Sequence, residues 1–380
     1  MDALTTPSNW QKVRLGDMCE ITTGSLDANE MVHYGKYRFY TCAKEYYFID
    51  KYAFDTEAIL ISGNGAYVGY VHYYKGKFNA YQRTYVLDNF SEHIIFVKYF
   101  LTMFLQSHIQ TNRNEGNTPY IVMGTLKDFE ILLPPLDEQI AIANVLSGLD
   151  RYLYSLDALI LKKESVKKAL SFELLSQRKR LKGFNQNWQK VRLGDIAEII
   201  GGGTPSTQVA SFWNGSINWF TPTEIGITKY VHKSQRTITP LGLKKSSAKL
   251  LPIGTILLTS RASIGDCAIL KVVATTNQGF QSLIPLEKIN NEFLYYLMLT
   301  LKNKLLKLAS GSTFLEVSPN KIKKLLIPLP PLNEQIAIAN ILSDLDNEII
   351  SLKNKKRQFE NIKKALNHDL MSAKIRVLKN

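Results

Sequence analysis

The sequence predicts an α+β protein in which two globular α/β domains are separated by a pair of long antiparallel coiled-coil helices, with pseudo-two-fold symmetry. Three observations lead to this fold class. The 380-residue chain contains one module twice, each module is a variable domain followed by a helical stretch, and both helical stretches carry apolar heptads. We expect a first domain at residues 1–136, a first helix at 137–182, a second domain at 183–332 and a second helix at 333–380.

Two segments establish the duplication. Residues 9–17 read NWQKVRLGD, and the same letters return at residues 187–195. Residues 133–150 read LPPLDEQIAIANVLSGLD, and residues 329–346 differ from them at three of eighteen positions. Between these landmarks the halves diverge, with faint echoes such as Gln82 opposite Gln278. Two copies this long indicate a pseudo-dimer in one chain rather than a solenoid.

Each repeated segment opens a long amphipathic helix. Pro134 and Pro135 end a strand-like run and block helix upstream of them. Downstream, apolar residues recur at spacings of four and three, namely Ile142, Leu146, Leu149, Leu153, Leu156 and Ile160, and then Ile338, Leu342, Leu345, Ile349, Leu352, Phe359, Ile362 and Leu366. A helix of about 45 residues runs roughly 67 Å. Because so long a seam needs a partner, we expect the two helices to pair antiparallel, with the variable domains at opposite ends.

The variable domains look strand-rich. Residues 58–62 and 67–73 flank Gly63-Asn64-Gly65, which is typical of a hairpin turn, and residues 253–259 and 267–273 repeat the arrangement. Residues 96–108 and 292–308 show helical periodicity.

Composition narrows the class of partner. A net charge of +14 favours a polyanion, and we expect nucleic acid. A membrane is the weaker interpretation, because no apolar run approaches the roughly 20 residues that span a bilayer. The polar start lacks the build of a secretory signal. Three scattered cysteines (Cys19, Cys42 and Cys267) suit neither a disulfide framework nor a zinc site, so a cytoplasmic location is expected.

At these residues the chain resembles the specificity subunits of Type I restriction–modification systems, over essentially its whole length. The resemblance is carried by the twin Trp-x-x-Val-x-Leu-Gly-Asp openings and the twin Pro-Pro-Leu-x-Glu-Gln segments that lead into heptads. The loop Gly202-Gly203-Thr204-Pro205-Ser206, followed by Trp213-Asn214-Gly215, is similar to the start of a target recognition domain. The first half departs from this pattern, with Thr23-Gly24-Ser25-Leu26 in place of the Gly-Gly-Thr-Pro loop.

The resemblance implies that each variable domain reads one half of a split, asymmetric site in double-stranded DNA. It implies that the paired helices act as a spacer and as the docking platform for two methyltransferase subunits. Motor–nuclease subunits are further candidate partners. No cofactor, metal ion or catalytic residue is implied for this chain.

Candidate base-reading residues lie near predicted turns. Arginine pairs with guanine, and asparagine or glutamine with adenine, through the major groove. The candidates are Asn64, Gln82, Arg83, Arg113 and Asn117 in the first domain, and Thr204, Arg236, Arg261, Asn277 and Gln278 in the second. Lys44, Tyr67 and Tyr81 are candidates for contact with the DNA backbone or sugar. For each residue, a plain surface or turn-stabilising role is the alternative.

Two further groups have two interpretations each. The first group either bends the chain from domain into helix or contacts a methyltransferase subunit; it comprises Pro134, Pro135, Glu138 and Gln139, with Pro330, Pro331, Glu334 and Gln335. The second group either meets phosphates or acidic partners or forms a solvated helix face; it comprises Lys162, Lys163, Lys167, Lys168, Arg178, Lys179 and Arg180, with Lys353, Lys355, Lys356, Arg357, Lys363 and Lys364.

Signatures of catalysis are missing from the sequence. It has no Gly-x-x-x-x-Gly-Lys-Ser/Thr phosphate loop, no His-Glu-x-x-His motif and no Asn-Pro-Pro-Tyr/Phe or Asp-Pro-Pro-Tyr segment of an amino-methyltransferase. The six histidines show no ligand spacing. We therefore expect a non-catalytic DNA-binding subunit. The alternatives are a coiled-coil interaction scaffold that no longer reads DNA and a self-sufficient methyltransferase, which would need a cofactor-binding domain.

Overall fold

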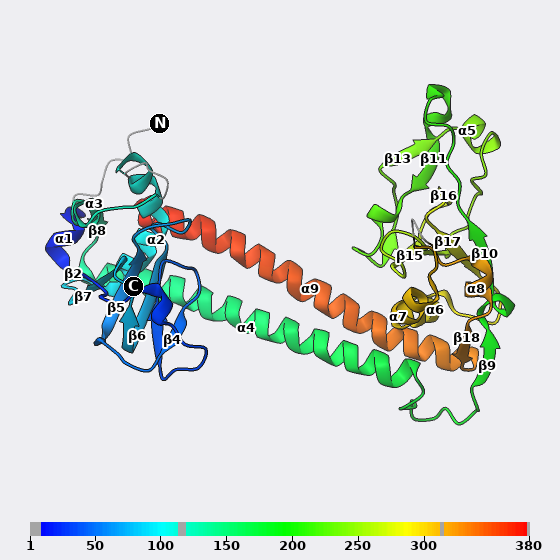
Figure 1. The fold of residues 1–380 in the computed structure, drawn as a ribbon, viewed down its shortest axis with the longest axis horizontal. Coiled ribbons are helices and arrows are strands. Elements are labelled where there is room, and N and C mark those ends of the chain that lie inside the picture. The colour runs from blue at the N-terminus through cyan, green and yellow to red at the C-terminus, as the bar shows by residue number, and fades with distance from the viewer. Residues whose placement is uncertain (1–8, 113–118, 312–314, 378–380) are drawn as a thin grey trace. The chain divides into compact units, whose positions relative to one another are not determined.

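A computed structural model describes residues 9–112, 119–311 and 315–377. The chain divides into two compact units. Unit 1 contains the segments Met1–Asp157 and Asn354–Asn380, and unit 2 contains Ala158–Lys353. The helices α4 (Leu136–Leu175) and α9 (Leu332–Met371) are each unbroken, and each contributes one part to unit 1 and another to unit 2 (Figure 1). Each unit is therefore one α+β domain together with a section of both long helices, which confirms the predicted fold class.

A six-stranded sheet forms the body of unit 1. Its order is β2-β7-β5-β6-β3-β4, and neighbours are antiparallel except for β3 and β6. The strands are β2 (Glu20–Thr23), β3 (Tyr37–Tyr40), β4 (Tyr47–Ile49), β5 (Phe54–Ser62), β6 (Val71–Ala80) and β7 (Thr84–Asp88). Side chains of β5 alternate between two apolar clusters, with Ile59 and Ile61 in one and Ala58 and Leu60 in the other. Burial on both faces explains the continuous apolar run of this strand.

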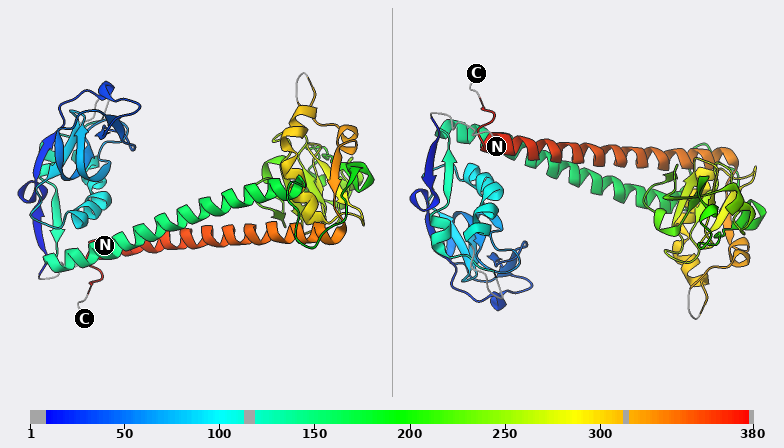
Figure 2. Two further views of the ribbon diagram at one scale, coloured as in Figure 1. Left: turned by 90° about the horizontal axis from the view of Figure 1, so that it is seen from below. Right: turned by 90° about the horizontal axis from the view of Figure 1, so that it is seen from above.

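Helix α2 (Ile94–Asn112) covers one face of this sheet, since Phe96 and Phe100 share a cluster with Ile59. A separate antiparallel ladder joins β1 (Gln11–Arg14) to β8 (Glu130–Leu133), visible as a blue and a blue-green strand in Figure 2. The short helices are α1 (Leu15–Met18), η1 (Ala28–Glu30) and α3 (Met123–Lys127). The ladder brings the repeated opening segment next to the strand that leads into α4.

Unit 2 repeats this architecture with the sheet divided in two. Strands β10-β17-β14-β15-β12 form one sheet and β13-β11-β16 another. The strands are β10 (Ala197–Gly201), β11 (Trp213–Phe220), β12 (Tyr230–Val231), β13 (Arg236–Ile238), β14 (Ile256–Leu258), β15 (Cys267–Leu270), β16 (Ala274–Thr276) and β17 (Gln281–Pro285). The single long strand β6 of unit 1 corresponds to β15 and β16, which residues 271–273 separate. Strand β11 pairs in parallel with β16, as β3 does with β6. It therefore belongs to the second sheet, with β16, and not to the sheet that contains β15.

Some of the other elements of unit 2 also have counterparts in unit 1. Strand β9 (Gln189–Arg192) pairs with β18 (Leu326–Leu329) as β1 does with β8. The helices are η2 (Leu193–Asp195), η3 (Ala210–Phe212), η4 (Pro222–Glu224), α5 (Pro240–Lys244), α6 (Asn291–Thr300), α7 (Lys302–Leu308) and α8 (Pro319–Lys323). The helix expected at 292–308 is interrupted at Leu301, whose N–H donates to Met298 O (3.0 Å) in a tightened turn.

The sections of α4 and α9 pair antiparallel within each unit. In unit 1, Asp157 meets Lys356 (2.7 Å) and Asp150 meets Lys363. In unit 2, Glu164 meets Lys353 (2.6 Å), and Lys167, nearer the C-terminal end of α4, meets Asp346, which is nearer the start of α9. Seam residues buried between the helices or at their domains include Ile142, Leu146, Leu156, Ile160, Ile338, Leu342 and Ile349. The burial of these residues confirms the predicted heptad seam.

One seam assignment is wrong. Ile362 is 43% exposed, whereas its neighbour Lys363 is half-buried and ion-paired with Asp150. Phe359 packs on Tyr152 with ring centroids 4.7 Å apart, so the spacing of four and three continues through Lys363 rather than Ile362. The aliphatic stem of a lysine can occupy a seam position while its ammonium group reaches a carboxylate.

Both long helices end earlier than expected. Helix α4 stops at Leu175 rather than near 182, because Gln177 adopts a left-handed conformation (φ 62°) and Lys179 N–H turns back to Glu173 O (3.1 Å). Helix α9 stops at Met371, and Ala373 repeats the left-handed turn (φ 57°). The repeat therefore includes the way in which each helix ends.

Candidate nucleic-acid interface

Connecting segments of unit 1 meet at one end of strands β5, β6 and β7. Gly63 N–H donates to Arg83 O (2.8 Å), and Ile121 N–H donates to Gly63 O (3.0 Å). The expected hairpin is present, since β5 and β6 are antiparallel, but their connection is the longer segment 63–70. Gly69 N–H closes it by donating to Ser62 O (2.7 Å). The backbone thus holds three loops together around the position of Asn64.

Five predicted residues of the first domain lie on these loops or beside them. Lys44 Nζ stands 5.3 Å from the centre of the Tyr67 ring, and both side chains are exposed. Gln82 and Arg83 are exposed and help to line a pocket of about 260 Å³. Asn64 is half-buried on the loop between β5 and β6. Arg113 and Asn117 lie outside the described residues, so their predicted role stays a prediction.

The same backbone bridges occur in unit 2. Ser260 N–H donates to Gly279 O (2.8 Å), and Val317 N–H donates to Ser260 O (3.0 Å). These positions correspond to Gly63, Arg83 and Ile121 of unit 1. The two domains therefore carry one loop scaffold in common.

The predicted residues of the second domain have different surroundings on this scaffold. Thr204 Oγ1 donates to the exposed Gln278 Oε1, which joins two candidates directly. Asn277 Oδ1 accepts from Gly279 N–H (2.8 Å), which is the turn-stabilising alternative for that residue. Arg261 forms an ion pair with Glu316 (3.1 Å), so its charge is already partly balanced within the domain.

A glycine allows the first loop of each domain to approach the sheet. A Cβ on Gly24 would lie 1.9 Å from Ala80 O, and one on Gly202 would lie 1.8 Å from Asn277 O. Although the first half lacks the Gly-Gly-Thr-Pro pattern, it therefore keeps the glycine that this close approach requires. Close approach of two backbones is what both positions require.

We expect Gly202→Ala to lower the stability of unit 2 by about 1–3 kcal/mol, because a backbone carbonyl cannot move aside as a side chain can. Trp219 Nε1 donates to the neighbouring Gly203 O (2.8 Å), so tryptophan fluorescence during denaturation reports on this loop. Gly201→Ala is the matched control, since its nearest atom is a Gln281 side-chain oxygen at 3.7 Å. Equal unfolding curves for the two variants would contradict the assignment.

Arg236 lies on strand β13 of the smaller sheet rather than on the loops. Its guanidinium carbon is 3.7 Å from the centre of the Trp213 ring and 5.4 Å from that of Trp219. Trp213 Nε1 donates to Ser206 O (3.0 Å), which ties this sheet to the loop that contains Thr204. An exposed guanidinium thus lies over an indole ring that is tied to the Thr204 loop.

The Pro-Pro-Leu-x-Glu-Gln segments serve the interior of each unit. The buried Gln139 donates to Pro134 O (2.9 Å) and accepts from His93 N–H (3.1 Å). Gln335 repeats this, donating to Pro330 O (2.9 Å) and accepting from Asn290 N–H (2.8 Å). Each glutamine therefore connects the start of a long helix to the domain that precedes it.

The glutamates of these segments hold the end of the other long helix. Glu334 is fully buried and accepts from Arg180 Nη2 (2.8 Å) and from Trp188 Nε1 (3.0 Å). Glu138 accepts from Arg376 Nε and Nη2 (both 2.6 Å). Each of the four polar side chains thus has partners within its own unit. A methyltransferase contact by this group, in which Pro135 is exposed and Pro331 half-buried, stays a prediction.

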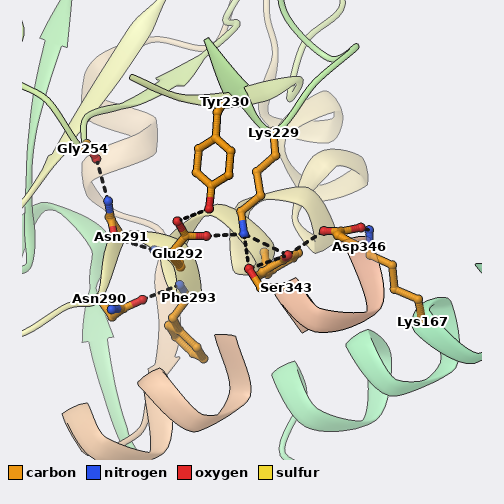
Figure 3. A network of polar contacts seen from close by, with 11 residues as sticks. Lys167, Lys229, Tyr230, Gly254, Asn290, Asn291, Glu292, Phe293, Ser343 and Asp346 are labelled. Carbon is orange, nitrogen blue, oxygen red and sulfur yellow. Dashed lines mark hydrogen bonds and ion pairs between the residues drawn. The ribbon is translucent and has the colours of Figure 1, made fainter. Parts of the chain in front are cut away.

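A polar cluster joins each domain to the helices, and the sequence analysis did not find it. In unit 2, Lys229 pairs with Glu292 and donates to Tyr296 OH (3.0 Å), which in turn donates to Asp346 Oδ2 (2.6 Å; Figure 3). Burial and the bond to Asp346 raise the pKa of Tyr296. In unit 1, Tyr99 OH donates to Asp150 in the same way (2.5 Å). Only packing reveals the cluster, because its members are scattered along the chain.

The basic residues of the helices divide between the two interpretations. Seven of the predicted residues form ion pairs with carboxylates, namely Lys163, Lys167, Lys179, Arg180, Lys353, Lys356 and Lys363. Six others are exposed and make no ion pair with any described residue, namely Lys162, Lys168, Arg178, Lys355, Arg357 and Lys364. Five of the seven ion pairs join α4 to α9, and the six exposed residues remain open to an external anion.

Among the described residues, no three His, Cys, Asp or Glu side chains gather as a metal site would require. None of the described helices combines the length and apolarity needed to span a bilayer. The three cysteines are unpaired, and burial raises the pKa of the Cys19 thiol to about 12.

Comparison with known proteins agrees with this geometry. The family described as "Type I restriction modification DNA specificity domain" matches residues 7–163 and 185–361. The chain is 41% identical over 183 residues to the Type I restriction enzyme MjaIX specificity subunit of Methanocaldococcus jannaschii, covering 47% of this chain and 42% of that protein. It is 26% identical over 410 residues to the MjaVIII specificity subunit of the same organism, covering 99% and 95%.

A crystal structure of the S subunit of a Type I restriction-modification system from M. genitalium has the same fold. Its TM-score is 0.66 at 20% identity, and the match covers 97% of both chains. The chain matches less than half the length of the first relatives found, 42% in the case of MjaIX. The family match nevertheless extends over both halves. This chain belongs to the family of Type I restriction modification DNA specificity domains.

Proposed function

We propose that this chain is the DNA-reading subunit of a Type I restriction–modification enzyme, with each variable domain reading one half of a bipartite, asymmetric site. It has no catalytic step of its own and works in the cytoplasm, where it directs partner enzymes to the target. One observation carries the proposal. The two domains share a hydrogen-bonded loop scaffold but present different side chains on it, with Arg83 in unit 1 where unit 2 has Gly279.

Electrostatics support the same role. The net charge of +14 suits a polyanionic partner, and the candidate loops expose Lys44, Gln82 and Arg83. Phosphate contacts would supply most of the affinity and base contacts the choice of site, so we expect binding to weaken steeply with salt.

The long helices are the basis for a second part of the proposal, which concerns the spacer and the partner subunits. We propose that α4 and α9, which pair through interhelical ion pairs and a buried seam, hold a spacing between two half-sites. Because residues 133–150 and 329–346 differ at only three of eighteen positions, the starts of the two helices suit two copies of one partner. We propose that they bind two methyltransferase subunits, which motor–nuclease subunits then join.

The decisive experiment exchanges residues 197–310 for the equivalent domain of a relative and sequences DNA methylation in cells that contain the partner subunits. We expect one half-site to change completely while the other half-site and the spacer stay the same. A control chain that carries the same junction sequences but keeps its own residues 197–310 should read both original half-sites. If both half-sites change, the domains do not read independently. Duplex binding that is absent or insensitive to salt would favour the interaction scaffold instead.

A further inference from the structure

Arg38 is clamped between two tyrosine rings on strand β3. Its guanidinium carbon lies 4.2 Å from the centre of the Tyr46 ring and 4.4 Å from that of Tyr74. Nη1 donates to Tyr40 OH (3.3 Å). Two aromatic rings this close restrain the guanidinium and leave donors of its edge available for hydrogen bonds.

The charge of Arg38 is not balanced within the described structure. Several other cations of unit 1 are paired with carboxylates, such as Lys51 with Glu30 (3.0 Å) and Lys75 with Glu57 (3.0 Å). Arg38 has no such partner among the described residues, and its Nε and Nη2 donate to none of them. A half-buried guanidinium with free donors and no carboxylate suits an external acceptor.

The stacked arginine of unit 2 sits on the corresponding pair of strands. Strand β3 joins β6 in parallel and pairs with β4, while β11 joins β16 in parallel and pairs with β13. Arg38 lies on the inner strand of its pair, and Arg236, on Trp213, lies on the outer strand. Each domain therefore places one aromatic-supported arginine on the corresponding edge pair of strands, Arg38 on the inner strand and Arg236 on the outer strand opposite Trp219.

Arg38 also adjoins the candidate loops. Tyr46, one of its two rings, is two residues from Lys44, which stands over Tyr67. Cys42 Sγ donates to Arg83 O (3.2 Å), which connects the same segment to the loop that carries Gln82. Arg38 and the predicted residues thus belong to one continuous part of the domain.

We propose that Arg38 and Arg236 are specificity-determining residues, each donating two hydrogen bonds to one guanine in the half-site read by its domain. A planar guanidinium presents two donors that match guanine O6 and N7 in the major groove. Because the two arginines lie on different strands of the edge pair, the guanine has a different place in each half-site. This inference rests on the proposed function, because it presupposes that the domains read DNA.

The test uses the full chain with its methyltransferase partners and duplexes in which each base pair of the first half-site is replaced in turn. For the unaltered protein, one guanine replacement should weaken binding by roughly 5- to 150-fold. Arg38→Ala and Arg38→Lys should both reduce that discrimination to within about threefold, and leave the other positions and the second half-site unchanged. Lys fails because it lacks the planar pair of donors. Lys51→Ala is the matched control and should behave as the unaltered protein.

Three results would overturn the inference. They are a first half-site without guanine, retained discrimination in Arg38→Lys, or a uniform loss of affinity with a salt slope smaller by about one, which marks a phosphate contact. Tyr46→Leu keeps the arginine and removes one ring, so it should lower the discrimination partially even if Arg38→Ala unfolds. If the unaltered complex shows no preference for any bipartite site, the proposed function itself is wrong, and not only the assignment of Arg38 and Arg236 to guanine.

Discussion

Removing one heptad from each long helix is expected to shift the permitted spacer by about three base pairs without changing either half-site. Seven residues of helix span about 10 Å, and DNA rises 3.4 Å per base pair. The deletions should be 158–164 in α4 and 349–355 in α9. They retain Asp157 with Lys356 on one side and Lys167 with Asp346 on the other, so the seam can close in its original register. The measurement is selection from a duplex library with randomised spacer length.

A matched control replaces the same two segments with heptads of equal length and the same seam residues. That protein should select the native spacer, because neither helix has been shortened. If the double deletion also keeps the native spacer, the helices do not set the distance. If it selects altered half-site bases, the domains and the helices do not act separately.

The Glu334→Ala variant is expected to lose about 3 kcal/mol of stability in unit 2. The substitution leaves Arg180 and Trp188 without the buried carboxylate that accepts from both. In a domain of this size, such a loss lowers the melting temperature by about 6–10 °C. Trp188, Trp213 and Trp219 are three of the four tryptophans in the chain, so intrinsic fluorescence follows unit 2.

The repeat provides controls for this experiment. Trp188→Phe removes one hydrogen bond and should cost about 1 kcal/mol. Trp10→Phe, at the equivalent position of unit 1, should cost less, because the buried Trp10 Nε1 has no hydrogen-bond partner among the described residues. If Glu334→Ala melts as the unaltered protein does, the carboxylate is not what holds the end of α4 in unit 2.

The candidate site could be predicted in outline because its scaffold is local. Turn residues between strands are readable from glycine and from alternating apolar residues, and this reasoning found Lys44, Gln82 and Arg83 on adjoining loops. It missed Arg38, whose partners Tyr46 and Tyr74 lie on two other segments of the chain. A tyrosine-rich stretch at residues 34–52 was a signal, but it does not say which rings will enclose a cation.

The sequence by itself determined the duplicated order of domain and helix, the heptads and the family, because each of these is a pattern of neighbouring residues. Only tertiary structure decided what depends on distant partners. Such contacts pair Glu138 and Glu334 with the segments that follow the opposite long helices, and they shift the seam from Ile362 to Lys363. They also decide that unit 1 has one large sheet where unit 2 has two smaller sheets. Periodicity reports which residues prefer burial, whereas the partner that buries them is set by how the whole chain packs.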